Sequence, residues 1–258
     1  MHHVTQGSGK KLLFVHGIGS NSHTWRDQME AFAPERQVIA IDLPGHGQTP
    51  ATTRSATYAG LAQDLEDYLV AEGLAGIDLV GHSLGGRLVL DMAQRGRAGA
   101  VVALAPGGFW MGWERTYLQA NLLTSITLLR SLGSLRAGVA HNPISRSVLL
   151  AALSARPWHL DGTAVEAELD SYARTSTFVE LVNDLASAPM QTGPAHEGTG
   201  PIRIGWGMND RLCWPVQAKR ALAAFPSAKV EWFANCGHQV MWDRPAKSLE
   251  LIRQTMAI

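Results

Sequence analysis

Short apolar runs alternate along this chain with longer segments in which apolar residues recur every three or four positions. The short runs are nearly continuous in apolar residues, as is typical of strands that are buried on both faces of a parallel sheet. We therefore predict strands at Leu12–His16, Val38–Asp42, Asp78–Gly81, Val101–Ala105, Ile202–Gly205 and Val230–Phe233.

The longer segments between these strands have the periodicity of amphipathic helices. In the segment Tyr58–Glu72, Leu61, Leu65 and Leu69 fall on one helical face. The same pattern predicts helices at Thr24–Ala33, Leu84–Arg95, Pro215–Phe225 and Pro245–Met256. Strands that alternate with helices in this way predict right-handed βαβ units, and so an α/β fold with a mostly parallel, doubly wound sheet.

One long stretch, from Gly107 to about His196, has helical patterns and no clear strand. Helices are predicted there at Asn121–Leu135, Ser145–Ala155, Thr163–Thr175 and Phe178–Ala186. Because open α/β sheets bind ligands at the carboxyl ends of their strands, a helical insert at this place predicts a lid over that edge. We therefore divide the chain into a core, residues 1–106 and 197–258, and a helical lid, residues 107–196.

Composition and charge exclude several classes of protein. The chain has 258 residues, 46% of them hydrophobic and 17% charged, as expected of one globular domain. Its 22 basic residues balance its 22 acidic ones, so nothing favours nucleic acid or an anionic membrane as a partner. The sequence lacks an apolar run of membrane-spanning length and an N-terminal secretion signal, so we expect a cytoplasmic protein without a membrane span.

Cysteine and metal-ligand patterns predict no redox or metal chemistry. The two cysteines, Cys213 and Cys236, do not form a disulfide framework, and we expect free thiols. The sequence contains no H-x-x-x-H, C-x-x-C or clustered acidic pattern that would supply a ligand set. We therefore predict neither a metal nor a cofactor.

The segment Gly81-His82-Ser83-Leu84-Gly85 matches the pattern G-x-S-x-G. The pattern alone is weak in a chain with 26 glycines, where a glycine-rich turn with a solvated serine is the alternative. Here, however, it follows a predicted strand and opens a predicted helix, which is the context of a nucleophile elbow. This context predicts Ser83 as a catalytic nucleophile.

A serine hydroxyl needs a base to take its proton, and in such enzymes the chain order is serine, acid, histidine. Among the histidines after Ser83, only His238 follows a predicted strand in a short loop. Asp210 lies just past the preceding strand, 28 residues before His238, and is predicted to orient it. Two other acids, Glu231 inside a strand and Asp243 at a helix entrance, are expected to be solvated or to cap a helix.

An oxyanion hole needs backbone N–H groups that point at the developing negative charge. One donor is expected to be Leu84, directly after the nucleophile. The second is expected to be Ile18, in the glycine-rich loop after the first predicted strand. Phosphate binding by this loop is the alternative, but the loop lacks both the G-x-G-x-x-G spacing and the lysine of a P-loop.

Together these motifs resemble the α/β-hydrolase superfamily, in its single-domain, serine-esterase-like branch. The resemblance covers about residues 4 to 256 and implies the α/β-hydrolase fold with a Ser83–Asp210–His238 triad. It rests on His16-Gly17, Asp42 to Gly47, Gly81 to Gly86, Trp206-Gly207 through Asp210, and Cys236-Gly237-His238, in that order. Because only about eleven residues precede the first predicted strand, one N-terminal strand common in the family is expected to be missing. Related epoxide hydrolases and dehalogenases use an aspartate nucleophile, so Ser83 argues against both.

We therefore expect a serine hydrolase that cleaves carboxylic esters through an acyl-enzyme. The substrate is expected to be a small hydrophobic ester with a short to medium or aromatic acyl group. Phe109, Trp110 and Trp113, at the start of the insert, are candidates for its pocket, and packing within the lid is the alternative. Carbon–carbon bond hydrolysis, lactone hydrolysis and perhydrolysis would use the same triad. A ligand receptor that retains the triad is the alternative from another class.

Overall fold

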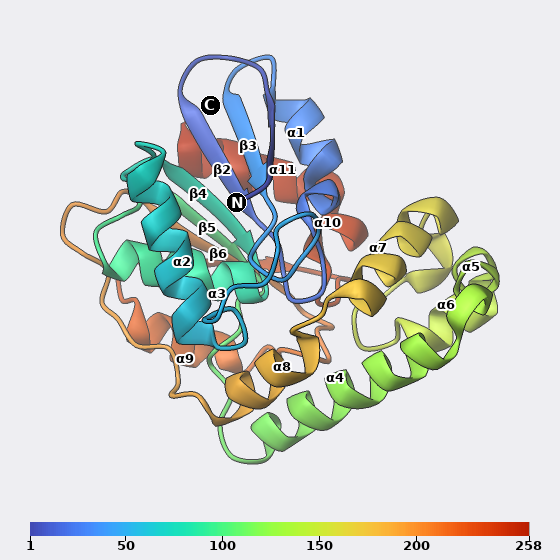
Figure 1. The fold of residues 1–258 in the computed structure, drawn as a ribbon. Coiled ribbons are helices and arrows are strands. Elements are labelled where there is room, and N and C mark those ends of the chain that lie inside the picture. The colour runs from blue at the N-terminus through green and yellow to red at the C-terminus, as the bar shows by residue number, and fades with distance from the viewer. Residues whose placement is uncertain (258) are drawn as a thin grey trace.

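The computed structural model describes residues 1–257, and a seven-stranded sheet forms its centre (Figure 1). The strand order is β1-β3-β2-β4-β5-β6-β7, and every neighbouring pair is parallel except β1 with β3. The strands are β1 (His3–Gln6), β2 (Lys11–Val15), β3 (Gln37–Ile41), β4 (Asp78–His82), β5 (Val101–Leu104), β6 (Ile202–Gly207) and β7 (Lys229–Phe233).

The structure contains all six predicted strands and one that the sequence pattern did not reveal. This additional strand, β1, pairs antiparallel with β3 at the edge of the sheet, with His3 opposite Ile41. It has only four residues and most of them are exposed, so it lacks the apolar run that marks the buried strands. The short N-terminal stretch therefore contributes one edge strand.

Alternate residues of the central strands feed two separate cores, one on each face of the sheet. In β2, Leu13 and Val15 pack toward the face that α2 and α3 cover, and Leu12 and Phe14 pack toward the face of α1 and α11. All four side chains are completely buried. The helices that cover the faces are α1 (Arg26–Phe32), α2 (Tyr58–Ala71), α3 (Leu84–Gln94), α9 (Gln217–Ala224) and α11 (Pro245–Met256) (Figure 1).

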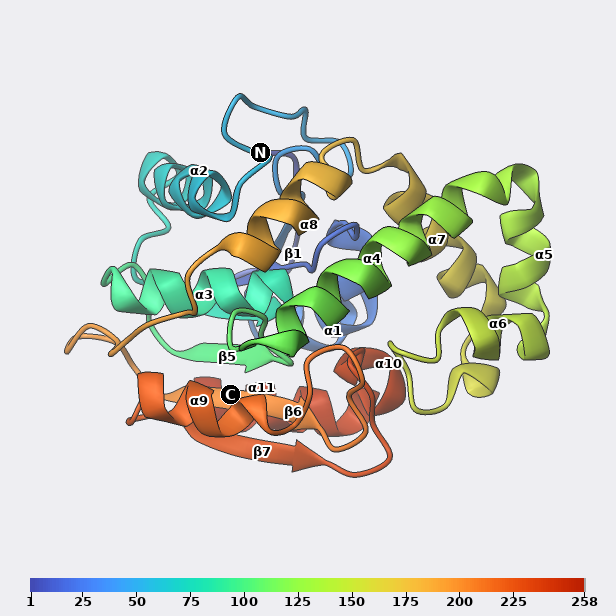
Figure 2. The ribbon, with the colours of Figure 1, turned by 90° about the horizontal axis from the view of Figure 1, so that it is seen from below.

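Helices α4 to α8 follow β5 and precede β6 along the chain, where the sequence predicts an all-helical insert (Figure 2). The first of them begins at Trp113, eight residues before the predicted start at Asn121, because Glu114 accepts a hydrogen bond from Met111 N at 2.8 Å and so holds the first turn. The helices are α4 (Trp113–Ser131), α5 (Arg136–His141), α6 (Pro143–Leu149), α7 (Gly162–Arg174) and α8 (Phe178–Ser187). Their division from the core as a lid remains a prediction. None of the helices described within residues 1–257 is long and apolar enough to cross a membrane.

Candidate active site

Ser83 occupies the sharp turn between β4 and α3. Its backbone has φ 54° and ψ −113°, a conformation that a residue with a side chain rarely adopts. The turn is so tight that a Cβ on Gly81 would lie 2.2 Å from the carbonyl oxygen of Gly85, so only glycine fits there. This strained turn presents the serine hydroxyl at the carboxyl end of the parallel strands.

His238 lies within hydrogen-bonding distance of both other residues of the predicted triad. Its Nε2 is 2.9 Å from Ser83 Oγ, and its Nδ1 is 2.9 Å from Asp210 Oδ2. Because a carboxylate only accepts hydrogen bonds, Nδ1 carries the proton, and Nε2 is free to accept from the serine hydroxyl. His238 can therefore act as a general base toward Ser83.

Asp210 is fixed in place by backbone donors. It follows β6, is 2% exposed, and accepts hydrogen bonds on Oδ1 from Leu212 N and Cys213 N, each at 2.8 Å. These two bonds leave Oδ2 for His238. The structure thus brings together the three side chains that the sequence places 28 and more residues apart.

Asp243, which the sequence suggested to be solvated or a helix cap, is instead buried. It accepts hydrogen bonds from Ser154 Oγ at 2.5 Å, Ala155 N at 2.8 Å and Gly237 N at 2.6 Å. It therefore connects the helical insert to the loop that carries His238. The solvated role predicted for this residue is wrong, because its carboxylate is buried and accepts hydrogen bonds from three donors of the protein.

The two predicted oxyanion donors lie beside the serine. The loop that contains Ile18 touches the nucleophile, since a Cβ on the preceding Gly17 would be 3.2 Å from Ser83 Cβ. Leu84 is the first residue of α3, where a backbone N–H has no partner within the helix. In the described part of the chain, Ile18 N donates no hydrogen bond to a backbone or side-chain acceptor, and Leu84 N donates none to an acceptor outside α3. Their role as oxyanion donors remains a prediction.

His82, directly before Ser83, contacts the backbone of the loop that carries His238. Its Nε2 lies 3.0 Å from the carbonyl oxygen of His238. Burial, together with the smaller effect of the neighbouring His238 ring, lowers the pKa of His82 to about 3. His82 is therefore neutral at physiological pH, and its ring N–H donates to that carbonyl. No role was predicted for His82 from the sequence, although it stands inside the G-x-S-x-G motif.

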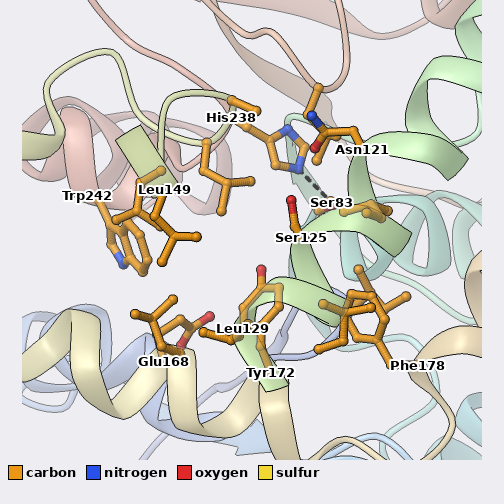
Figure 3. A pocket seen from close by; sticks show the side chains of 18 residues that line it. Ser83, Asn121, Ser125, Leu129, Leu149, Glu168, Tyr172, Phe178, His238 and Trp242 are labelled. Atoms are coloured by element: carbon orange, nitrogen blue, oxygen red, sulfur yellow. Dashed lines mark hydrogen bonds between the residues drawn. The ribbon is translucent and has the colours of Figure 1, made fainter. Parts of the chain in front are cut away.

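A small apolar pocket opens at Ser83 (Figure 3). Its cavity volume is about 60 Å³. Since one water needs about 10–15 Å³ on this scale, the cavity holds roughly four to six groups of that size. The insert supplies most of the wall: Asn121, Leu122, Ser125, Ile126, Leu129, Leu149, Leu150, Ala152, Leu153, Glu168, Leu169, Tyr172 and Phe178, to which Ile18, Leu212, His238 and Trp242 are added.

The aromatic residues that the sequence suggested for the pocket do not line it. Phe109 and Trp110 are buried in the core, and Arg87 of α3 lies over the Trp110 ring. Trp113 is 63% exposed and packs edge-on against Trp214, with 5.6 Å between the ring centroids. The pocket prediction is therefore corrected. The spacing of Leu122, Ile126 and Leu129 on α4 was a signal for the true wall, whereas Trp242 reaches it only through tertiary packing.

The structure shows neither a disulfide nor a cluster of metal ligands among the residues it describes. Cys213 and Cys236 are free and buried. Burial raises the pKa of both thiols, that of Cys236 to about 12, so neither is reactive at neutral pH. Within residues 1–257, no group of three or more His, Cys, Asp or Glu side chains is arranged to hold a metal ion.

Comparison with known proteins adds independent findings. Residues 12–250 match the sequence profile of the alpha/beta hydrolase family. An uncharacterised protein of Mycobacterium tuberculosis is 26% identical over 260 residues, which cover 97% of this chain and 76% of that protein. Among solved structures, an esterase from Exiguobacterium antarcticum has a TM-score of 0.80 at 16% identity and covers 100% of this chain and 95% of its own. A thermophilic esterase from Thermogutta terrifontis has a TM-score of 0.77 at 19% identity, with 98% and 91% covered. At such identities the structural likeness shows the fold.

Proposed function

Because this chain belongs to the alpha/beta hydrolase family, we propose that it is a serine hydrolase that cleaves carboxylic esters through an acyl-enzyme. One observation carries the proposal: an unbroken hydrogen-bond chain runs from Ser83 Oγ through His238 to Asp210, with 2.9 Å at each step. The Ser83 end of this series of hydrogen bonds opens into an apolar pocket, which suits the acyl part of a small hydrophobic ester.

In the proposed reaction Ser83 Oγ attacks the ester carbonyl and passes its proton to His238 Nε2. Asp210 stabilises the imidazolium that results. The N–H groups of Ile18 and Leu84 would bind the oxyanion, and each such donor contributes roughly 3 kcal/mol to transition-state stabilisation. His238 then protonates the leaving alcohol. A water molecule attacks the acyl-enzyme, gives its proton to His238 and releases the acid, which restores Ser83.

The pocket size favours short to medium acyl groups. A cavity for about four to six water-sized groups accepts an acyl chain with a similar number of atoms beyond the carbonyl. The helical insert, residues 107–196, would act as a lid over the bound acyl chain, because it supplies most of the pocket wall. Longer acyl groups would require the helices of the insert to move apart.

Labelling with a fluorophosphonate, followed by an ester panel, tests the proposal. The wild type and a Ser187→Ala control, whose exposed serine lies at the end of α8, should both be labelled and should both hydrolyse short p-nitrophenyl esters. Ser83→Ala should do neither. Labelling without turnover of any ester would instead favour carbon–carbon bond hydrolysis or a ligand receptor. Labelling of Ser83→Ala would refute the assignment of the nucleophile.

A further inference from the structure

A carboxylic acid side chain, Glu168, lies in the wall of the pocket that holds Ser83. It projects from α7 on the side of the pocket away from Ser83 and His238, beside Tyr172 (Figure 3). Only 7% of its surface is exposed. The neighbouring wall residues are mostly apolar, so this carboxyl is the chemically distinctive group at the far end of the pocket.

The carboxyl has unused hydrogen-bonding capacity. Within residues 1–257, Glu168 Oε1 is buried and has no hydrogen-bond partner. The hydroxyl of Ser20 is near enough to influence this carboxyl, yet Ser20 Oγ also lacks a partner of normal geometry in the same part of the chain. Gln239 Oε1 is a third buried atom without one, and Tyr172 neighbours both Glu168 and Gln239. Polar atoms from three segments therefore lack partners near Glu168 and Tyr172, and of the three residues that carry these atoms Glu168 is the one that lines the pocket.

Burial also favours the neutral, protonated form of the Glu168 carboxyl. It raises the pKa of the Glu168 carboxyl to about 7, while the Ser20 hydroxyl acts in the opposite direction. A buried carboxyl without a partner destabilises a protein, and a hydrocarbon side chain of similar size would pack here at lower cost. The cost is explained if a ligand group supplies the missing partner.

We propose that Glu168 selects the acyl group of the substrate by hydrogen bonding to a hydroxyl at the end of the acyl chain. The inference rests on the proposed esterase function, because it assigns the far end of the pocket to the acyl group that Ser83 would carry. Such a substrate is an ester of a short ω-hydroxy acid. It is the cavity volume of about 60 Å³ that limits the chain to about six atoms beyond the carbonyl.

A hydroxyl suits this place better than an alkyl or an ammonium group. It both donates and accepts, so it can donate to the ionised Glu168 carboxylate and can accept from the protonated carboxylic acid. An alkyl end would leave the buried oxygens unsatisfied. An ammonium ion would lose its hydration among apolar walls, with one partly protonated carboxyl as its counter-charge.

The test compares two ester series. Ethyl ω-hydroxyalkanoates of five to eight carbons are paired with ethyl alkanoates in which a methyl group replaces the hydroxyl, and uncatalysed rates are subtracted. At the best chain length, wild-type kcat/KM should be at least about tenfold higher for the hydroxy ester. Glu168→Leu should lose this preference and favour the methyl partner. Glu168→Gln should keep most of it, because an amide also donates and accepts.

The control variants are Glu166→Leu and Glu166→Gln. Glu166 lies on the same helix, but its side chain is 37% exposed and pairs with His141 at 3.0 Å. Neither control should change the ratio of hydroxy to methyl rates. Should Glu168→Leu fail to fold, Glu168→Ala provides the apolar comparison.

The outcomes separate the inference from the function on which it rests. Equal rates for the two series in the wild type, unchanged in Glu168→Leu, would overturn the inference and leave ester hydrolysis intact. A preference for ω-amino esters over ω-hydroxy esters would overturn the assignment of a neutral hydroxyl. An enzyme that cleaves none of these esters and resists the fluorophosphonate would overturn the proposed function, and the inference with it.

Discussion

The buried carboxyl of Glu168 makes a quantitative prediction about stability and pH. In the folded protein burial raises the pKa of this group from the ordinary 4.5 to about 7. Between these two values the folded state holds a proton that the unfolded chain has released. The stabilisation is therefore complete below about pH 4.5 and is lost as the pH rises through 7. Glu168→Gln, which cannot titrate, removes this dependence.

The size of the effect follows from the same two values. At about 1.4 kcal/mol per pH unit, the interval from 4.5 to about 7 corresponds to about 3 kcal/mol. As the pH is raised from 5 to 8, the free energy of unfolding of the wild type should fall relative to that of Glu168→Gln by up to this amount. The carboxyl is only 7% exposed, so solvent screening reduces the figure little.

Urea unfolding at pH 5, 6, 7 and 8 measures this difference. Other titrating groups, including the buried histidines, act in both proteins and cancel in the comparison. A Glu166→Gln control should follow the wild type closely, since this side chain is partly exposed and its ion pair with His141 lies at the surface. If the Glu168→Gln curve also runs parallel to the wild type, Glu168 is ionised in the folded protein and the reasoning about its burial is refuted.

Further predictions concern the catalytic residues, the length of the pocket and the buried histidines. Ser83→Ala should lower kcat on a simple ester by more than about 10³ while the unfolding temperature stays unchanged, and a smaller loss would exclude Ser83 as the nucleophile. Asp210→Asn should lower kcat by about 10⁴, because the histidine tautomer would be wrong. Asp243→Asn should instead lower the free energy of unfolding by about 1–3 kcal/mol through its lost backbone contacts, so equal kinetic losses in both variants would contradict the choice of acid. On p-nitrophenyl esters, each methylene added to the acyl chain should improve kcat/KM by up to about 0.8 kcal/mol, until about four to six atoms fill the pocket. The optimum should be the same in Trp113→Ala. A flat series would show that the pocket does not hold the acyl chain. Burial lowers the pKa of His16, His46 and His82 to about 3 or 4. The free energy of unfolding of the wild type should therefore fall as the pH drops from 6.5 toward 4, by up to about 1.4 kcal/mol per pH unit for each histidine. A free energy of unfolding that stays level over this range would show that these histidines are protonated in the folded state.

Local sequence patterns were enough to predict the sheet and the three side chains that meet at its edge. Strands buried on both faces have a continuous apolar run, and a short motif fixes the turn at Ser83, because its glycines are required by contacts within a few residues. Asp210 and His238 could be chosen because parallel strands place the loops that follow them at one edge. The edge strand β1 could not be predicted in this way, since it has no buried face along most of its length.

Tertiary packing alone decided what surrounds the serine. The aromatic cluster at Phe109–Trp113 looks like a pocket wall in the sequence, but packing buries part of it in the core and leaves Trp113 at the surface. Asp243 and Glu168 are acids in helices, where such residues are normally solvated. Only the insert folding back over the sheet buries both, because the groups that cover them come from segments far apart in the chain. The sequence by itself determined the fold and the candidate triad, and the packing of the insert determined the pocket and the environment of Glu168.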